Sequence, residues 1–153
     1  MITVSDTTAI TTLLKVERTD LLTELFGSLL IPPAVERELK AHHHFIPACC
    51  EVRALADSGR LTRLLAHADH GEAEAICLAV EARATILLID DKKGRGLAEA
   101  EGVRCLGLPA IVLAAKQRQL IISASEFFDL LEQRGNFCLS SRTRSELTKQ
   151  AGE

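Results

Sequence analysis

Two apolar segments of this chain end directly in acidic residues, and this feature limits the folds that the chain can adopt. Residues 86–89 are all Ile or Leu and run into Asp90 and Asp91. The strand-like residues 2–5 run into Asp6. Segments without a clear alternation of apolar and polar residues indicate strands that are covered on both faces, as in a parallel sheet flanked by helices. Ligands bind such sheets at the carboxyl ends of the strands, so we expect a metal site near Asp6 and Asp90, where an unpaired carboxylate beside a packed core needs a cation or a donor.

Length and composition indicate one soluble globular domain. A chain of 153 residues can bury a single core, and 47% hydrophobic with 25% charged residues is the usual balance of a soluble protein. The longest apolar runs are far shorter than the roughly 20 residues that cross a bilayer, and residues 1–10 do not resemble a signal peptide. We therefore expect a cytoplasmic protein without a membrane partner. With a formal net charge of −3, the chain lacks the positive electrostatic potential that is typical of nucleic-acid-binding proteins. We therefore expect any phosphate-bearing partner to bind at a local site, through a metal ion.

Strand and helix signals alternate along the chain, which indicates an α/β fold. We expect one domain over residues 1–153, with a core of about residues 2–120. Residues 121–153 add an amphipathic helix at 125–131 and a polar tail. Strands are predicted at 2–5, 29–31, 85–89 and 103–106, and helices at 7–16, 20–26, 34–42, 49–58, 71–84, 92–101 and 109–119.

Helix geometry separates inward-facing acids from surface acids in the predicted helix 34–42, because residues three or four apart share a face. Glu38 shares its face with Val35 and therefore points toward the core. Glu36 lies four residues before Lys40, a spacing that is typical of a solvated ion pair. Glu38 is thus the candidate site residue of this helix.

The predicted helix 71–84 offers two acids. Glu72 lines up with Ala75 on the small apolar face that should meet the sheet, which makes it the better candidate. Glu74 aligns with Leu78 and becomes the candidate if the helix is rotated.

The acidic pair after the later strand leaves two alternatives open. Asp90 and Asp91 would point to opposite faces of a continuing strand, so a regular strand end places only one of them in the site. An irregular turn would admit both. Asp91 could instead pair with Lys92 or Arg95 at the start of the next helix.

The other acids also have local explanations when each is taken alone. Asp6 and Asp69 could each cap a helix, and Glu72 could favour the positive start of its own helix. Two acids at strand ends and two on inward helix faces nevertheless point to a shared site. Such hard oxygen ligands select Mg²⁺ or Mn²⁺, and a water activated by these ions can hydrolyse a phosphodiester.

Four segments of the chain, in order, resemble the motifs of a PIN domain, and most closely those of the toxin-like (VapC-like) branch that was long catalogued as a domain of unknown function. The resemblance covers about residues 2–120. Many PIN nucleases keep a Ser or Thr two residues before the acid of the fourth strand, and this chain departs from that pattern with Leu88 or Ile89, according to which Asp is aligned. The four segments are VSDTT at 4–8, PAVEREL at 33–39, GEAEAICLA at 71–79 and LIDDKKGR at 88–95.

The resemblance implies a three-layer α/β/α fold around a central parallel sheet of four to five strands. It also implies acidic residues that hold Mg²⁺ or Mn²⁺ and cleave single-stranded or structured RNA. Carried over by position, Asp6 takes the role of the first-strand acid and Glu38 that of the second-helix acid. Glu72 takes the role of the central-helix acid, and Asp90 or Asp91 that of the fourth acid.

Three basic residues follow the fourth acid. Lys92, Lys93 and Arg95 could hold the RNA backbone. A solvated helix start explains the same residues equally well.

Two functions remain open. The first is a divalent-metal-dependent endoribonuclease that acts as the toxin of a toxin–antitoxin pair, as the resemblance implies. A small antitoxin protein would then block the site, by offering a basic side chain to the acids, and we expect the toxin to form a homodimer. The second is a non-catalytic PIN-like module that binds RNA or protein without cutting, which the missing Ser or Thr and the negative net charge would favour.

Overall fold

The computed structural model describes residues 1–153 and contains five strands and nine helices. The strands form one parallel sheet in the order β3-β2-β1-β4-β5, which places β1 at its centre. None of the nine helices is both long enough and apolar enough to cross a membrane. The strands are β1 (Thr3–Ser5), β2 (Leu29–Ile31), β3 (Cys50–Val52), β4 (Ile86–Leu88) and β5 (Cys105–Leu106). The helices are α1 (Thr7–Lys15), α2 (Asp20–Phe26), α3 (Pro33–His43), α4 (Ser58–Leu65), α5 (His70–Glu81), α6 (Lys92–Ala100), α7 (Leu108–Gln117), α8 (Ala124–Arg134) and α9 (Ser141–Gln150).

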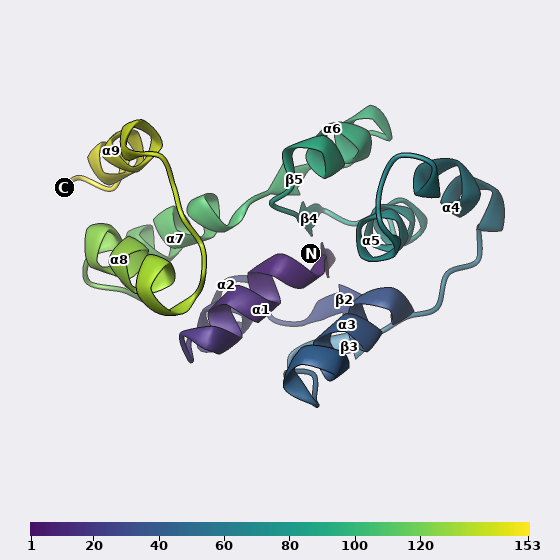
Figure 1. The fold of residues 1–153 in the computed structure, drawn as a ribbon, viewed down its shortest axis with the longest axis horizontal. Coiled ribbons are helices and arrows are strands. Elements are labelled where there is room, and N and C mark those ends of the chain that lie inside the picture. The colour runs from purple at the N-terminus through teal and green to yellow at the C-terminus, as the bar shows by residue number, and fades with distance from the viewer.

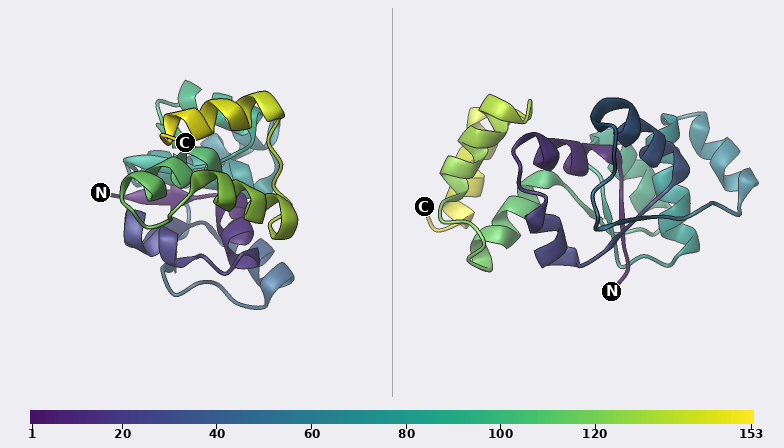
Figure 2. Two further views of the ribbon diagram at one scale, coloured as in Figure 1. Left: turned by 90° about the vertical axis from the view of Figure 1, so that its left-hand side faces the viewer. Right: turned by 90° about the horizontal axis from the view of Figure 1, so that it is seen from below.

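Each face of the sheet has its own hydrophobic cluster. In β4, Ile86 and Leu88 belong to the first cluster and Leu87 to the second, because successive side chains of a strand point to opposite faces. Helices α1, α2, α3, α7 and α8 contribute to the first cluster, and α4, α5 and α6 to the second. Figure 1 shows α7, α8 and α9 at one end of the molecule and α4 at the other, as does the right-hand view of Figure 2. The predicted three-layer α/β/α fold around a parallel sheet is confirmed.

Local sequence explains where the two helices beside the sheet edge begin and end. Helix α3 starts at Pro33, whose fixed φ suits the first helical position. It ends at His43, because His44 takes a left-handed φ of 66°. Helix α5 starts after Asp69, whose side chain accepts a hydrogen bond from the Glu72 N–H at 2.8 Å.

The helix predicted at 49–58 is wrong. Residues 50–52 form β3, and the Leu29 N–H donates to the Cys49 carbonyl at 2.8 Å beside it. The open edge of β2 offers unpaired backbone groups to any neighbouring segment, and the half-exposed residues of β3 do not form the continuous apolar run that marks β2 and β4. The next helix is α4, which begins after Asp57, where the carboxylate accepts the Arg60 N–H at 2.9 Å.

The predicted polar tail, which runs through Glu153, contains a ninth helix that its sequence did not predict. Ser140 caps α9 by accepting the Thr143 N–H at 3.2 Å. Leu147 packs against the first cluster, and Arg144 forms an ion pair with Asp129 of α8. These tertiary contacts hold α9 against the rest of the protein, and a polar sequence does not reveal them.

Candidate active site

Asp6 lies at the centre of the candidate site, directly after β1. Its backbone N–H donates to the Leu88 carbonyl of β4 at 2.9 Å, which fixes the residue at the carboxyl edge of the sheet. The side chain is buried, with 6% of its surface exposed. Burial, with smaller contributions from the negative charges of Glu72, Asp69 and Glu38, raises the pKa of Asp6 from 3.8 to about 7. A carboxylate in this environment is either protonated or in need of a cation.

Glu38 approaches Asp6 from helix α3. The Thr7 hydroxyl, one residue after Asp6, donates to Oε2 of Glu38. The other carboxylate oxygen lies against the backbone of Gly71, where an added Cβ would come within 2.6 Å of Oε1. The absence of a side chain at Gly71 therefore lets Glu38 reach the first turn of α5.

Glu72 stands in the first turn of α5 and is half-buried. Burial raises the pKa of Glu72 above its ordinary value, and the charges of Asp69, Asp91 and Glu38 add to the effect. Glu38 lies between the other two acids along the chain contacts, because it meets Thr7 next to Asp6 and Gly71 next to Glu72. The structure thus brings Asp6, Glu38 and Glu72 together at one edge of the sheet. We call these three residues, with the neighbouring Asp69, the acidic group.

Asp69 is an acid of this group that sequence reasoning treated only as a possible helix cap. It does cap α5, through the Glu72 N–H. Its charge also raises the pKa values of Asp6 and Glu72. The signal that could have found it is its position three residues before Glu72, on the same side of the helix start.

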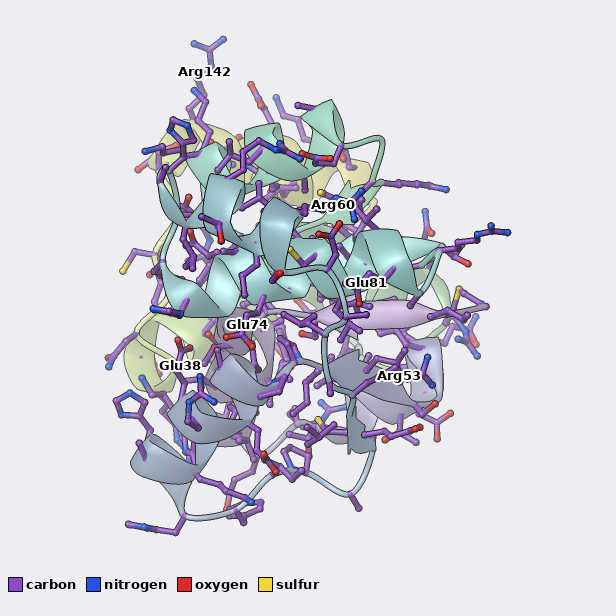
Figure 3. All side chains as sticks on the ribbon, turned by 90° about the vertical axis from the view of Figure 1, so that its right-hand side faces the viewer. Glu38, Arg53, Arg60, Glu74, Glu81 and Arg142 are labelled. Carbon is purple, nitrogen blue, oxygen red and sulfur yellow. The ribbon has the colours of Figure 1, made fainter.

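Glu74 has structural contacts of its own and does not contribute to the raised pKa values of Asp6 and Glu72. Its carboxylate accepts the Ala34 N–H at 3.1 Å and so satisfies a free donor at the start of α3. Oε2 lies 3.6 Å from the guanidinium of Arg37 and 4.0 Å from Nδ1 of His70. Figure 3 shows Glu38 and Glu74 between the blue ribbon of α3 and the teal ribbon of α5. Of the two acids of α5 that the sequence offered, only Glu72 joins the acidic group.

The two aspartates after β4 turn in different directions. Oδ1 of Asp90 accepts the Leu108 N–H at 2.7 Å at the start of α7, while its Oδ2 is buried without a hydrogen-bond partner. Burial raises the pKa of Asp90, and the Leu108 hydrogen bond and the charge of Arg95 oppose this shift. Asp91 is exposed, caps α6 through the Gly94 N–H at 2.7 Å, and contributes negative charge at Glu72. The structure therefore places Asp91 beside the acidic group and Asp90 outside it.

The basic residues after Asp91 are also divided. Lys92 and Lys93 are exposed in the first turn of α6. Arg95 is half-buried. Its guanidinium and the Asp90 carboxylate both lie beside Gly107, because a Cβ added to Gly107 would be 3.4 Å from Nη1 of Arg95 and 3.1 Å from Oδ1 of Asp90. Arg95 thus acts as a counter-charge for Asp90, whereas Lys92 and Lys93 remain free to meet a ligand.

The donor set fits a divalent cation by its chemistry. None of Asp6, Glu38, Glu72, Asp69 and Asp91 forms an ion pair with Lys, Arg or His. Carboxylate oxygens without counter-charge are the ligands that Mg²⁺ and Mn²⁺ prefer. No three His, Cys, Asp or Glu side chains are already arranged to hold a metal ion together. Side-chain rotation at the acidic group would therefore have to accompany binding.

Comparisons with known proteins identify the fold and the family. The chain matches the family model described as DUF3368, a PIN domain, over residues 2–153. It is similar to a PilT N-terminus domain protein from the hyperthermophilic archaeon Sulfolobus solfataricus, with a TM-score of 0.58 and 18% sequence identity over 75% of this chain and 93% of that chain. A search of curated proteins finds no significant match. PIN domains are generally nucleases that use divalent metal ions. The chain belongs to the PIN-domain family.

Proposed function

We propose that this protein is a divalent-metal-dependent endoribonuclease, with Mg²⁺ or Mn²⁺ as its cofactor, and the toxin component of a toxin–antitoxin pair. One observation carries the catalytic part of this proposal. Asp6, Glu38 and Glu72 lie at the carboxyl edge of a parallel sheet, where their negative charges act on one another and no basic side chain pairs with them. A divalent cation supplies the missing positive charge.

Four acids would be the ligands of the metal ion in the proposed site. Asp6, Glu38, Glu72 and Asp91 would hold the ion, which supplies an activated water and offsets the charge that develops on the leaving oxygen. The Thr7 hydroxyl orients the carboxylate of Glu38. We leave Asp90 out of this ligand set, because its Oδ1 accepts the Leu108 N–H at the start of α7 and the charge that acts on it is that of Arg95.

The toxin role rests on the resemblance of the chain to toxin-like PIN domains. A small antitoxin protein that presents a basic side chain would neutralise the same acids that bind the metal, and so would block the site. We propose a homodimer and a cytoplasmic location as parts of the same hypothesis. Light scattering on the purified protein measures its mass in solution, and a monomer would contradict the homodimer.

Cleavage of a mixed RNA pool tests the catalytic proposal. The purified protein is incubated with the pool in Mn²⁺, in Mg²⁺ and in a chelator, and internal cuts are mapped by sequencing. Asp6→Asn removes one proposed ligand and should lower the cleavage rate by at least ~100-fold. Asp90→Asn is the matched control, because it changes a neighbouring strand-end carboxylate outside the acidic group and should keep most of the activity.

A non-catalytic PIN-like module is the second candidate function. It is favoured by the absence of a ready-made group of three ligands and by Leu88 or Ile89 at the position of the hydroxyl residue. Metal binding by the folded protein without any cleavage would support this module and contradict the nuclease.

A further inference from the structure

Five residues with basic or aromatic side chains gather where helices α1 and α3 end, and we call them the His/Phe patch. Its members are Lys15, His42, His43, His44 and Phe45. The rings of His42 and His43 lie edge to face, with their centroids 6.5 Å apart. Phe45 follows the helix end with 53% of its surface exposed.

The patch is connected to the acidic group by the two helices that carry it. Helices α1 and α3 lie side by side and run in the same direction (Figure 1). Thr7 contacts Glu38 near the acidic group, and one turn further along Thr11 contacts His43, with 3.2 Å between Oγ1 and Nε2. At about 1.5 Å per helical residue, the patch begins less than about 10 Å from Glu38. A strand of RNA whose phosphate lies at the acids would reach it within a few nucleotides.

The chemistry of the patch differs from that of the acidic group. Lys15 is exposed and forms no ion pair. Burial lowers the pKa of His43, and the positive charges of His42, Lys15 and His44 lower it further, which shows that these groups are mutually close. The negative end of the α3 dipole explains why basic residues suit this position. It does not explain an exposed phenylalanine in a chain whose only aromatic residues, apart from His, are five Phe.

We propose that the His/Phe patch binds single-stranded RNA beside the acidic group, with Phe45 and His42 stacking on bases and Lys15 contacting a phosphate. Unpaired bases stack on exposed aromatic and imidazole rings, whereas the bases of a duplex are not available for stacking. Lys15 places a positive charge in the patch, on a molecule whose formal net charge is −3, which suits a polyanion held locally. The inference rests on the proposed nuclease function, because that function places a phosphate of the same RNA strand at the acidic group. Its test does not require cleavage.

Binding of a fluorescently labelled, unstructured RNA oligonucleotide is measured by anisotropy with the full chain in chelator, where metal-dependent cleavage cannot occur. Phe45→Ala should weaken binding about 5- to 150-fold, the usual effect of removing one stacked base contact. Lys15→Ala should reduce the slope of log affinity against log salt concentration by about 0.7, the value for one phosphate contact with a single strand.

Two control variants match these changes on other surfaces. Ile122→Ala removes an apolar side chain that is 92% exposed, and Arg142→Ala removes a cation of α9 whose side chain is 90% exposed. Figure 3 shows Arg142 well away from Glu38. Both controls should leave the affinity for RNA and its salt dependence unchanged.

The same binding is also measured with a duplex RNA of the same length. Three outcomes would overturn the inference. The unsubstituted chain could fail to bind RNA, Phe45→Ala could bind as tightly as the unsubstituted chain, or Phe45→Ala could weaken the binding of single-stranded and duplex RNA equally. A patch that proves to bind a protein partner instead would appear as unchanged RNA binding by Phe45→Ala. Failure of the proposed nuclease is distinguishable from all of these, because it would leave Phe45-dependent binding intact while the metal-supplemented protein still cuts no RNA.

Discussion

A carboxylate oxygen of Glu38 lies where the side chain of Gly71 would begin, since an added Cβ would come within 2.6 Å of Oε1. Gly71→Ala should therefore displace the carboxylate and lower the cleavage rate about 10- to 100-fold, the usual range for disturbing the orientation of a metal ligand. Alanine is the better helix former, by about 1 kcal/mol, which opposes the cost of the clash. Cleavage rate and free energy of unfolding, measured on one preparation, separate the two effects.

Gly96→Ala provides the control for this substitution. Gly96 is also a helical glycine, but no atom lies within 4 Å of the place where its Cβ would be. The variant should gain about 0.5–1 kcal/mol in free energy of unfolding and keep full activity. Equal activities of the Gly71→Ala and Gly96→Ala variants would show that Glu38 does not depend on its position against α5.

The neighbouring aspartates after β4 should give opposite results. Asp90→Ala leaves the Leu108 N–H without its acceptor, so we expect a loss of about 1–3 kcal/mol in free energy of unfolding and little change in cleavage rate of the folded protein. Asp91→Asn keeps a good cap for α6 and should reduce cleavage without a comparable loss of stability. Urea unfolding and cleavage assays measure the two quantities. The reverse pattern would return Asp90 to the ligand set.

Glu74 should matter for stability and not for chemistry. Glu74→Ala removes the acceptor of the Ala34 N–H at the start of α3, and we expect it to cost about 1–3 kcal/mol in free energy of unfolding. Glu74→Gln keeps an acceptor oxygen and should lose less. A Glu74→Gln variant that is fully stable but inactive would place Glu74 in the catalytic group.

The metal-free protein should become less stable as the pH rises from about 4 to about 7, because of Asp6. The pKa of Asp6 is raised from 3.8 to about 7 in the folded chain, so folding favours the protonated carboxyl. Its stabilising contribution is fully present below the ordinary pKa and is lost as the pH rises through the folded value. Asp6→Asn removes this contribution. Both proteins are measured in chelator. The free energy of unfolding of Asp6→Asn minus that of the unsubstituted chain should therefore increase across this interval, by at most about 1.4 kcal/mol per pH unit.

Added Mn²⁺ should reverse this effect near neutral pH. A bound cation favours the ionised carboxylate, so the melting temperature of the unsubstituted chain should rise with Mn²⁺ concentration. Asp6→Asn should show a smaller rise. Identical Mn²⁺ titrations for both proteins would mean that Asp6 does not contact the ion.

Sequence patterns predicted the parts of the fold that are marked by a continuous apolar run or by the spacing of apolar residues along a helix. The run at 86–89 predicted β4, and the helical spacing around Glu38 and Glu72 predicted the helices α3 and α5. The same spacing made Glu72 the inward acid of α5, whereas the buried acid of that helix is Glu74 and Glu72 is half-buried. Residues 50–52 carry no apolar run, because this edge strand is selected by the free backbone groups of β2 and not by its own side chains.

The direction of each strand-end acid was beyond sequence reasoning for a different reason. Alternation of side chains applies within a strand, and β4 ends at Leu88, two residues before the acidic pair. Beyond that point the start of α7 determines the orientation of Asp90, and α7 is 18 residues further along the chain at Leu108. The second role of Asp69 was hidden in the same way, since a helix cap and a member of an acidic group have the same local sequence.

The separation of the core into two clusters has a consequence for how substitutions combine. Packing changes confined to opposite faces of the sheet share no contacts, so their effects on stability should add. The contact between α3 and α5 is the exception, because Ala34 meets Glu74 there and Glu38 meets Gly71. Either layer can therefore change its apolar residues independently of the other. A substitution in α3 at this contact, in contrast, requires a matching substitution in α5 if the acids are to keep their spacing.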